Sequence, residues 1–249
     1  MGRPMVDRPI LMSGSMVVAT LREIKSPGTG KGETRRCVTK GTTTMDGGPW
    51  CNFVAPSAFK LDQAFVDRSY PDSPILKMPW DNLGHDVIAR VRPRIEIGDR
   101  LWVREAWRTP DTTDTIPPRD LVTNSVTNYI AGPSCEVYSW GRYRPSMHMP
   151  RWASRITLEV TDVQFERVQD ITEGGAQREG VTECPMFSTP EAPEYSIHGE
   201  TNVYPWRVGA FTELWDDLNE ARGFGWDANP WVIVISFTPM LCNIDRIAA

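Results

Sequence analysis

The sequence has no long hydrophobic run and no excess of positive charge. No segment approaches the roughly 18 consecutive apolar residues that a membrane span needs, and the N-terminus has no apolar signal-peptide core. The net charge at neutral pH is −5, which argues against strong electrostatic binding of the whole protein to long duplex DNA but still allows a local basic groove. We therefore expect no membrane partner and a cytoplasmic location.

Cysteine and histidine are sparse and scattered. The five cysteines form no C-x-x-C pair, and the three histidines form no H-E-x-x-H motif. An odd number of cysteines without a signal peptide favours reduced thiols. The sequence therefore predicts neither a metal site nor a cofactor.

What the chain does contain is a core and many loops. Hydrophobic residues make up 40% of the 249 residues and include ten tryptophans, whereas the 21 prolines and 19 glycines indicate extensive loops. We expect one domain over residues 1–249, with loop-rich insertions at about 39–80, 109–144 and 182–208.

The apolar periodicity predicts a limited set of helices and strands. A helix capped by Ser13 or Ser15 should end at Pro27, and a second should run from Asp170 or Thr172 to Gly180. A third helix is expected through 211–218, and strands at 8–12, 87–91, 100–107, 156–168 and 231–237. The two strands around the Gly98-Asp99 turn are expected to be adjacent, and a one-residue slip in 156–168 indicates a bulge. This order predicts an α+β barrel with helices at its ends.

The glycine-rich stretch LREIKSPGTGKGETRR, residues 21–36, brings a lysine and a threonine close to two arginines. Such a set suits an anionic or base-like ligand. The ATP-binding pattern G-x-x-x-x-G-K-[ST] fails here, because Lys25 stands at the first glycine position and Gly32 follows Lys31. A loop that touches phosphate through Lys31 and backbone N–H groups is more plausible.

This stretch and three later blocks resemble the ASCH superfamily, particularly its larger bacteriophage and prophage members. The first block extends over Arg8–Arg36. The later blocks are Gly98–Trp107, residues 146–160 with the A-x-x-E-G of Ala176–Gly180, and the terminal helix with the strand segment 229–237. The four blocks occur in the family's order. The resemblance implies a PUA-like small β-barrel that handles nucleosides or RNA.

One ASCH branch, bacterial amidohydrolases that deacylate acetylcytidine, looks like it uses a lysine, a threonine and a glutamate. The resemblance places the proton acceptor on Lys25, the nucleophile on Thr34 and the proton donor on Glu179. In the small enzymes the lysine and the threonine are only a few residues apart, so Lys31 is the alternative lysine. A threonine needs such a base within hydrogen-bond reach, and Arg35 and Arg36 would lower the pKa of the lysine and orient the ligand.

Arginines cluster around the aromatic residues Tyr143 and Trp152, and in an earlier stretch Trp102 and Trp107 flank Glu105, which could read a base edge. Guanidinium groups hold phosphate and aromatic rings stack on bases, so this composition favours nucleic-acid binding, with core packing as the alternative. The candidate binding residues are Trp102, Glu105, Trp107, Arg151, Trp152 and Arg155.

Several functions stay open at this point. The first is hydrolysis of an N-acylated cytidine, with a nucleoside or nucleotide as the partner. The alternatives are a binding module for RNA or a modified base that does no chemistry, a ribonuclease of phage origin, and an assembly protein. The sequence does not predict the oligomeric state.

Overall fold

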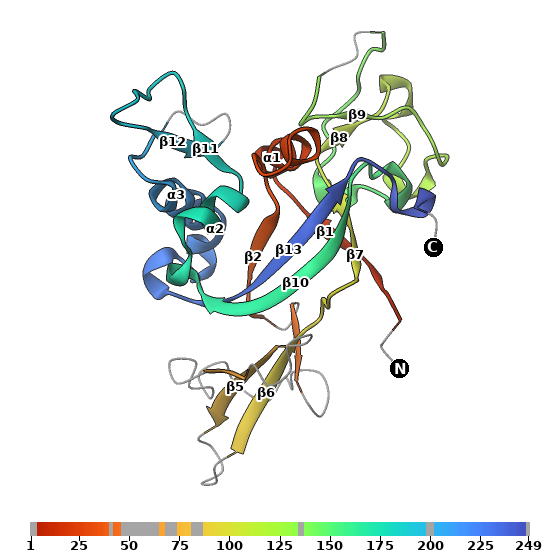
Figure 1. Cartoon of the computed structure of the whole chain (residues 1–249). Helices are drawn as coiled ribbons and strands as arrows, with labels where there is room; N and C mark the ends of the chain where they lie inside the picture. Colours follow the sequence, from red (N-terminus) through yellow and green to blue (C-terminus); the bar gives the residue numbers. More distant parts are fainter. Residues whose placement is uncertain are drawn as a thin grey trace.

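The structure is a computed structural model, and it describes residues 4–39, 42–45, 65–67, 74–80, 87–133, 137–197 and 202–247. It is a mixed α+β fold, made mostly of strands in several sheets with a few helices (Figure 1). The helices are α1 (Gly14–Lys25), α2 (Glu173–Arg178) and α3 (Arg207–Asn219). The strands are β1 (Asp7–Leu11), β2 (Glu33–Cys37), β3 (Thr43–Met45), β4 (Phe65–Asp67), β5 (Ile75–Trp80), β6 (Val87–Pro93), β7 (Arg100–Arg104), β8 (Trp107–Arg108), β9 (Asn128–Tyr129), β10 (Thr157–Arg167), β11 (Val181–Glu183), β12 (Tyr195–Ile197) and β13 (Trp231–Met240).

The central sheet has five strands in the order β1-β7-β10-β13-β2, and the long strands β10 and β13 curve across its middle (Figure 1). Strand β1 runs parallel to β7, and the other neighbours are antiparallel. In the described part of the chain β1 and β2 remain open edges, so no sheet closes into a barrel there. The PUA-like barrel therefore stays a prediction.

Strand β10 confirms the predicted slip in the apolar alternation. Its register against β13 shifts between Val160 and Asp162, which leaves Val160, Val163 and Phe165 all buried. A bulge adds one residue to one strand and restores the buried face beyond it.

Helix α1 begins where the sequence predicts. The Ser13 hydroxyl accepts a hydrogen bond from the Met16 N–H, and the helix ends at Lys25, just before Pro27. Val17 is fully buried in the main core. The chain runs from β1 at one edge of the sheet through α1 to β2 at the other edge.

Helices α2 and α3 lie together beside β2, with the hairpin β11–β12 next to them (Figure 1). Thr172 caps α2 through its hydroxyl, and Gly180 follows the helix at a φ of 109°, a region that favours glycine. Phe211 and Trp215 bury the inner face of α3. The hairpin lies within the predicted insertion 182–208 and forms a pair of short strands there.

The prediction that the strands on either side of Gly98-Asp99 are adjacent is wrong. Strand β6 pairs with β3 and β5 in a separate four-stranded sheet, whereas β7 pairs with β1 and β10. The turn itself exists, but the Gly98 N–H donates to the Val160 carbonyl, and the Asp99 carboxylate accepts from the Val6 N–H. The turn residues are therefore anchored to the central sheet and not to β6.

A second, smaller core lies beside β8 and β9, and only part of it comes from the predicted insertion 109–144. Trp107 is fully buried there and packs with Leu121, Met149 and Ala153. None of the described helices is both long enough and apolar enough to cross a bilayer.

Candidate functional site

The glycine-rich segment after α1 is folded tightly back onto that helix. The Glu23 carboxylate accepts hydrogen bonds from the N–H groups of Gly28 and Gly30, both at 2.8 Å. The Lys31 N–H donates to the Ala19 carbonyl at 3.0 Å. These bonds turn the chain so that the Lys31 side chain enters the protein.

Lys31 is fully buried and lies against Glu179 at the C-terminal end of α2. Its ammonium group donates to the Glu179 carbonyl at 3.0 Å and forms an ion pair with the Glu179 carboxylate. The two elements approach closely because Gly180 has no side chain: a Cβ there would lie 2.7 Å from the Ala19 Cβ. A lysine and a glutamate that are 148 residues apart thus meet inside the protein.

Arg35 surrounds this pair with a network of carboxylates. Its guanidinium donates to Glu166 at 2.7 Å, to Glu179 at 3.3 Å and to Glu33 at 3.4 Å. Glu33 also accepts from Arg178 at 2.5 Å. Buried charges are stable only when they are paired and hydrogen-bonded, so this network fixes Glu179 in place.

The environment shifts the pKa values of both Lys31 and Glu179. Burial lowers the pKa of Lys31, although the facing carboxylate opposes that shift. Burial alone would raise the pKa of Glu179, but Lys31, Arg35 and Arg36 outweigh it and lower that pKa. The Lys31 ammonium therefore gives up its proton more readily than an exposed lysine does.

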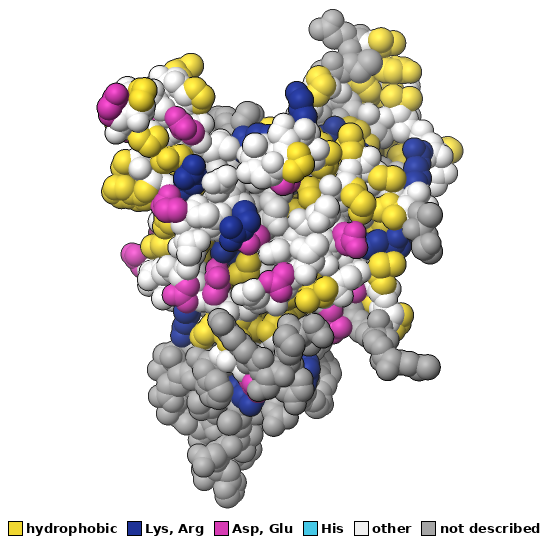
Figure 2. Space-filling view, viewed as in Figure 1, with side chains coloured by type: hydrophobic (Ala, Val, Ile, Leu, Met, Phe, Trp, Pro, Cys, Tyr) yellow, Lys and Arg dark blue, Asp and Glu magenta, His cyan; other side chains and the backbone are white. Residues whose placement is uncertain are grey.

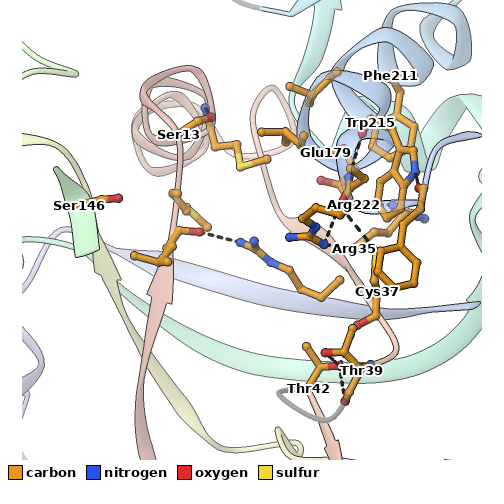
Figure 3. Close-up of a pocket in the computed structure, with 18 residues that line it drawn as sticks. Ser13, Arg35, Cys37, Thr39, Thr42, Ser146, Glu179, Phe211, Trp215 and Arg222 are labelled. Carbon is orange, nitrogen blue, oxygen red and sulfur yellow. Dashed lines mark hydrogen bonds and ion pairs between the residues drawn. The ribbon is translucent and has the colours of Figure 1, made fainter. Parts of the chain in front are cut away.

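A pocket of about 490 Å³ opens beside this network, between the N-terminal end of α1, strand β2 and helix α3 (Figure 3). Its charged lining consists of Glu179 and three arginines: Arg35, Arg36 and Arg222. Arg35, Arg222 and Glu179 lie together on one side of it, and Ser13 and Ser146 lie across from them. The volume falls within the usual range for small-molecule sites.

Aromatic side chains form the wall of the pocket on the α3 side. Phe211, Trp215 and Phe224 line it, and the Arg35 guanidinium lies 5.9 Å from the centre of the Phe211 ring. The Trp215 indole N–H donates to the Phe224 carbonyl, which fixes the ring. An apolar wall beside convergent charged groups is typical of a site for a flat, polar ligand.

Thr34 lies on β2 between Glu33 and Arg35 and is almost completely buried. Successive side chains of a strand point to opposite faces, so Thr34 faces away from Arg35. It is not among the residues that line the pocket, and within the described residues no hydrogen bond joins it to Lys31 or Glu179. Its role as nucleophile stays a prediction.

Lys25 and Lys31, the two candidates for the lysine role, occupy different environments. Lys25 is exposed at the end of α1, whereas Lys31 is buried against Glu179. Lys31 is also three residues from Thr34, the short separation that the resemblance implies. The structure thus brings Lys31, and not Lys25, together with Glu179.

The arginines of the predicted nucleic-acid stretch are already engaged by carboxylates. Arg155 donates twice to Glu105, at 2.9 Å each, and lies over the Tyr129 ring. Arg151 pairs with Asp7 and Asp245. Figure 2 shows basic and acidic side chains interspersed on the viewed face, which is not the arrangement of a basic groove.

The three candidate tryptophans also lie away from the pocket. Trp102 is buried on β7, and Trp107 is completely buried in the second core, where Trp152 meets it edge to face at 6.3 Å. Trp152 and Arg155 line a separate polar pocket of about 360 Å³. The structure therefore does not bring Trp102, Glu105, Trp107, Arg151, Trp152 or Arg155 to the pocket beside Glu179.

Sequence reasoning did not identify Arg222 or the aromatic wall. Arg222 belongs to a short 3₁₀ helix, Glu220–Arg222, that follows α3, and α3 was predicted only as an amphipathic core helix. Burial of the Cys37 thiol, which also lines the pocket, raises its pKa. Among the described residues no group of three or more His, Cys, Asp or Glu side chains gathers as a metal site would require.

Comparisons of the chain with models of known families, with curated proteins and with solved structures found no match.

Proposed function

We propose that the pocket beside Glu179 binds a pyrimidine nucleoside or nucleotide and that the protein hydrolyses an N-acyl group on its base. The observation that carries this proposal is the buried Lys31–Glu179 pair, with Glu179 also lining the pocket. A fully buried lysine whose pKa is lowered is a typical proton acceptor in enzymes. The ASCH resemblance supplies the substrate class.

The pair contains the proton that such a reaction needs. Transfer of one proton from the Lys31 ammonium to the Glu179 carboxylate along their hydrogen bond leaves a neutral amine and a carboxylic acid. The amine is then a general base, and the acid is a general acid for the leaving amine. One internal transfer therefore supplies both catalytic groups without any change in net charge, and the lowered pKa of Glu179 makes this neutral pair the minor form.

In the proposed reaction Lys31 takes the proton of the Thr34 hydroxyl as its oxygen attacks the amide carbon. Glu179 protonates the exocyclic nitrogen as its bond to that carbon breaks, and the cytosine amine leaves. Water then hydrolyses the acyl-threonine ester to the free acid and regenerates Thr34. Because Thr34 faces away from Arg35, this step is tested separately from the proton pair.

One contact supports a relation to a PUA-like barrel. The Arg36 guanidinium on edge strand β2 donates to the Leu11 carbonyl on edge strand β1, at 2.7 Å. A side chain thus spans the opening between the two edges of the sheet.

Lys31→Met should lower the rate of N4-acetylcytidine hydrolysis by about 10²–10⁴-fold, the usual contribution of a general base. Methionine keeps the length of the buried chain and removes only the amine. Lys25→Met, the matched change at the exposed lysine, should leave the rate close to that of the unaltered protein. Chromatographic measurement of cytidine release compares the variants.

Thr34→Val tests the role of the Thr34 hydroxyl independently of Lys31 and Glu179, because valine has nearly the same shape as threonine and no hydroxyl. We expect loss of turnover and loss of any acyl-enzyme seen by mass spectrometry after rapid quenching. Unimpaired turnover in Thr34→Val would assign the attack to water. If Lys31→Met and Thr34→Val both kept full activity, the proposed reaction would be wrong.

Recognition without chemistry is the second candidate, and the burial of Thr34 outside the pocket lining favours it. In that case the unaltered protein binds cytidine or N4-acetylcytidine in calorimetry but releases no acetate. Incubation with labelled single-stranded RNA separates plain binding from ribonuclease activity.

A further inference from the structure

Two of the three pocket arginines form no ion pair with a carboxylate of the described residues. Among the described residues, no Asp or Glu oxygen lies within ion-pair distance of Arg36 or Arg222. Arg36 donates to the Leu11 carbonyl. Arg222 donates to the Asn219 side-chain oxygen at 3.1 Å and lies near the Cys37 sulfur and the Phe224 ring. The hydrogen-bond partners of these two guanidinium groups in the described part of the chain are therefore neutral groups.

Arg35 differs from them in this respect. Its guanidinium already contacts Glu33, Glu166 and Glu179, so it is a structural member of the site with little capacity for a further anion. Of the pocket's charged lining, Glu179 balances one arginine, and two positive charges remain. This excess occurs in a protein whose net charge is −5, which makes it a local feature.

The two free guanidinium groups influence each other across the pocket. Burial lowers the pKa of Arg36, and the nearby Arg222 lowers it further, against the effect of Glu179. The Arg36 Nε is also buried with no hydrogen-bond acceptor in the described part of the chain. An anion that binds between two interacting positive charges removes their repulsion, and it can also accept from the unused donor.

We propose that Arg36 and Arg222 bind a phosphate group of the ligand, so that the site takes a nucleotide in preference to a neutral nucleoside. This inference rests on the proposed function of the pocket as a nucleoside site. The guanidinium fork matches phosphate oxygens in two parallel hydrogen bonds. The side chains of Phe211, Trp215 and Phe224 line the same pocket and give it an apolar side for the base.

Calorimetric titrations with cytidine, with cytidine 5′-monophosphate and with inorganic phosphate test the proposal. At low salt we expect the monophosphate to bind about tenfold or more tightly than cytidine, the effect of one or two charge-assisted hydrogen bonds. The preference should shrink as potassium chloride is raised. Inorganic phosphate should compete with the monophosphate but not with cytidine. Equal affinity for the two ligands at low salt overturns the proposal.

Arg222→Gln and Arg36→Gln should each reduce this preference, the ratio of the affinity for the monophosphate to the affinity for cytidine, to about threefold or less. Arg222→Lys, which keeps the charge without the fork, should retain part of it. Arg207→Gln is the matched control, since Arg207 also lies over an aromatic ring, Tyr195, but does not line the pocket. Thermal melting of each variant confirms folding. If both pocket variants keep the full preference, the proposal is wrong.

The test also separates this inference from the proposed function. The protein could hydrolyse acetylcytidine and its 5′-phosphate at the same rate and bind both with the same affinity. That result would refute only the phosphate site. Arg36- and Arg222-dependent binding of inorganic phosphate by a protein that binds no cytidine would refute only the nucleoside function. A short single-stranded oligocytidylate serves as the last titrant. If it binds more tightly than the monophosphate, the bound phosphate belongs to a nucleic-acid strand. If it binds more weakly, the ligand is a free nucleotide.

Discussion

Glu179→Gln should lower the free energy of unfolding by about 3–5 kcal/mol, the usual cost of removing one partner of a buried ion pair. The carboxylate, only 3% exposed, accepts from Lys31 and Arg35. An amide of the same shape cannot balance the Lys31 charge, and its NH₂ group faces a donor. Urea denaturation followed by tryptophan fluorescence measures the loss.

Glu166→Gln is the matched control for this change. Glu166 also accepts from Arg35, but its side chain is 25% exposed, and no second cation pairs with it in the part of the chain that the structure describes. We expect a loss of about 1 kcal/mol or less, because partly exposed pairs contribute little. Equal losses in the two variants would show that Glu179 is not the central acceptor of the network.

The double variant Lys31→Met/Glu179→Leu distinguishes an unpaired charge from lost packing. Removing both charges leaves no buried ion without a partner, so much of the stability lost in Glu179→Gln should return. Catalytic activity should not return. A double variant as unstable as Glu179→Gln would show that shape, and not charge, fixes this part of the core.

The stability difference between the unaltered protein and Glu179→Gln should also depend on pH. The folded protein holds the pKa of Glu179 below its usual value of 4.5. The unfolded chain therefore binds the proton first, and the contribution of this carboxylate is present above pH 4.5 and lost as the pH falls through the lower folded value. The unfolding curves of the two proteins should converge in that acidic window.

Local patterns predicted those elements whose signals lie within one stretch of chain. The Ser13 cap, the Thr172 cap and the slip in β10 each depend on neighbouring residues, and the structure confirms all three. The prediction of neighbouring strands around Gly98-Asp99 failed for the opposite reason. Partner choice depends on which distant strands compete for an edge, here β10 and β3.

The site was predictable only in part. Glu179 and the alternative lysine, Lys31, were identified from the sequence, but their contact depends on the folding of the glycine-rich loop onto α1. The arginines at 151 and 155 suggested nucleic-acid binding because sequence does not reveal that Asp7, Asp245 and Glu105 neutralise them. Arg222 carried no local signal, since a single arginine after a helix is usually a solvated cap.

Gly30→Ala should destabilise the protein by about 3 kcal/mol or more, at the upper end of the effects of overpacking. A Cβ at Gly30 would lie 2.3 Å from both the Ala19 carbonyl oxygen and the Glu23 backbone nitrogen. These are backbone atoms of α1, so no side-chain rotation relieves the contact, and the loop itself must move. Urea denaturation measures the loss of stability.

Gly32→Ala is the matched control two residues along the same loop. Its Cβ would meet only the Phe237 carbonyl oxygen at 3.9 Å, an ordinary contact, and its backbone does not have a positive φ. We expect a change of about 1 kcal/mol or less.

Because Lys31 follows Gly30 directly, movement of the loop should also separate Lys31 from Glu179, so Gly30→Ala should lose hydrolytic activity even at temperatures where it remains folded. A folded Gly30→Ala with full activity would mean that the close approach of this loop to α1 does not position Lys31, and the proton pair would then need another explanation.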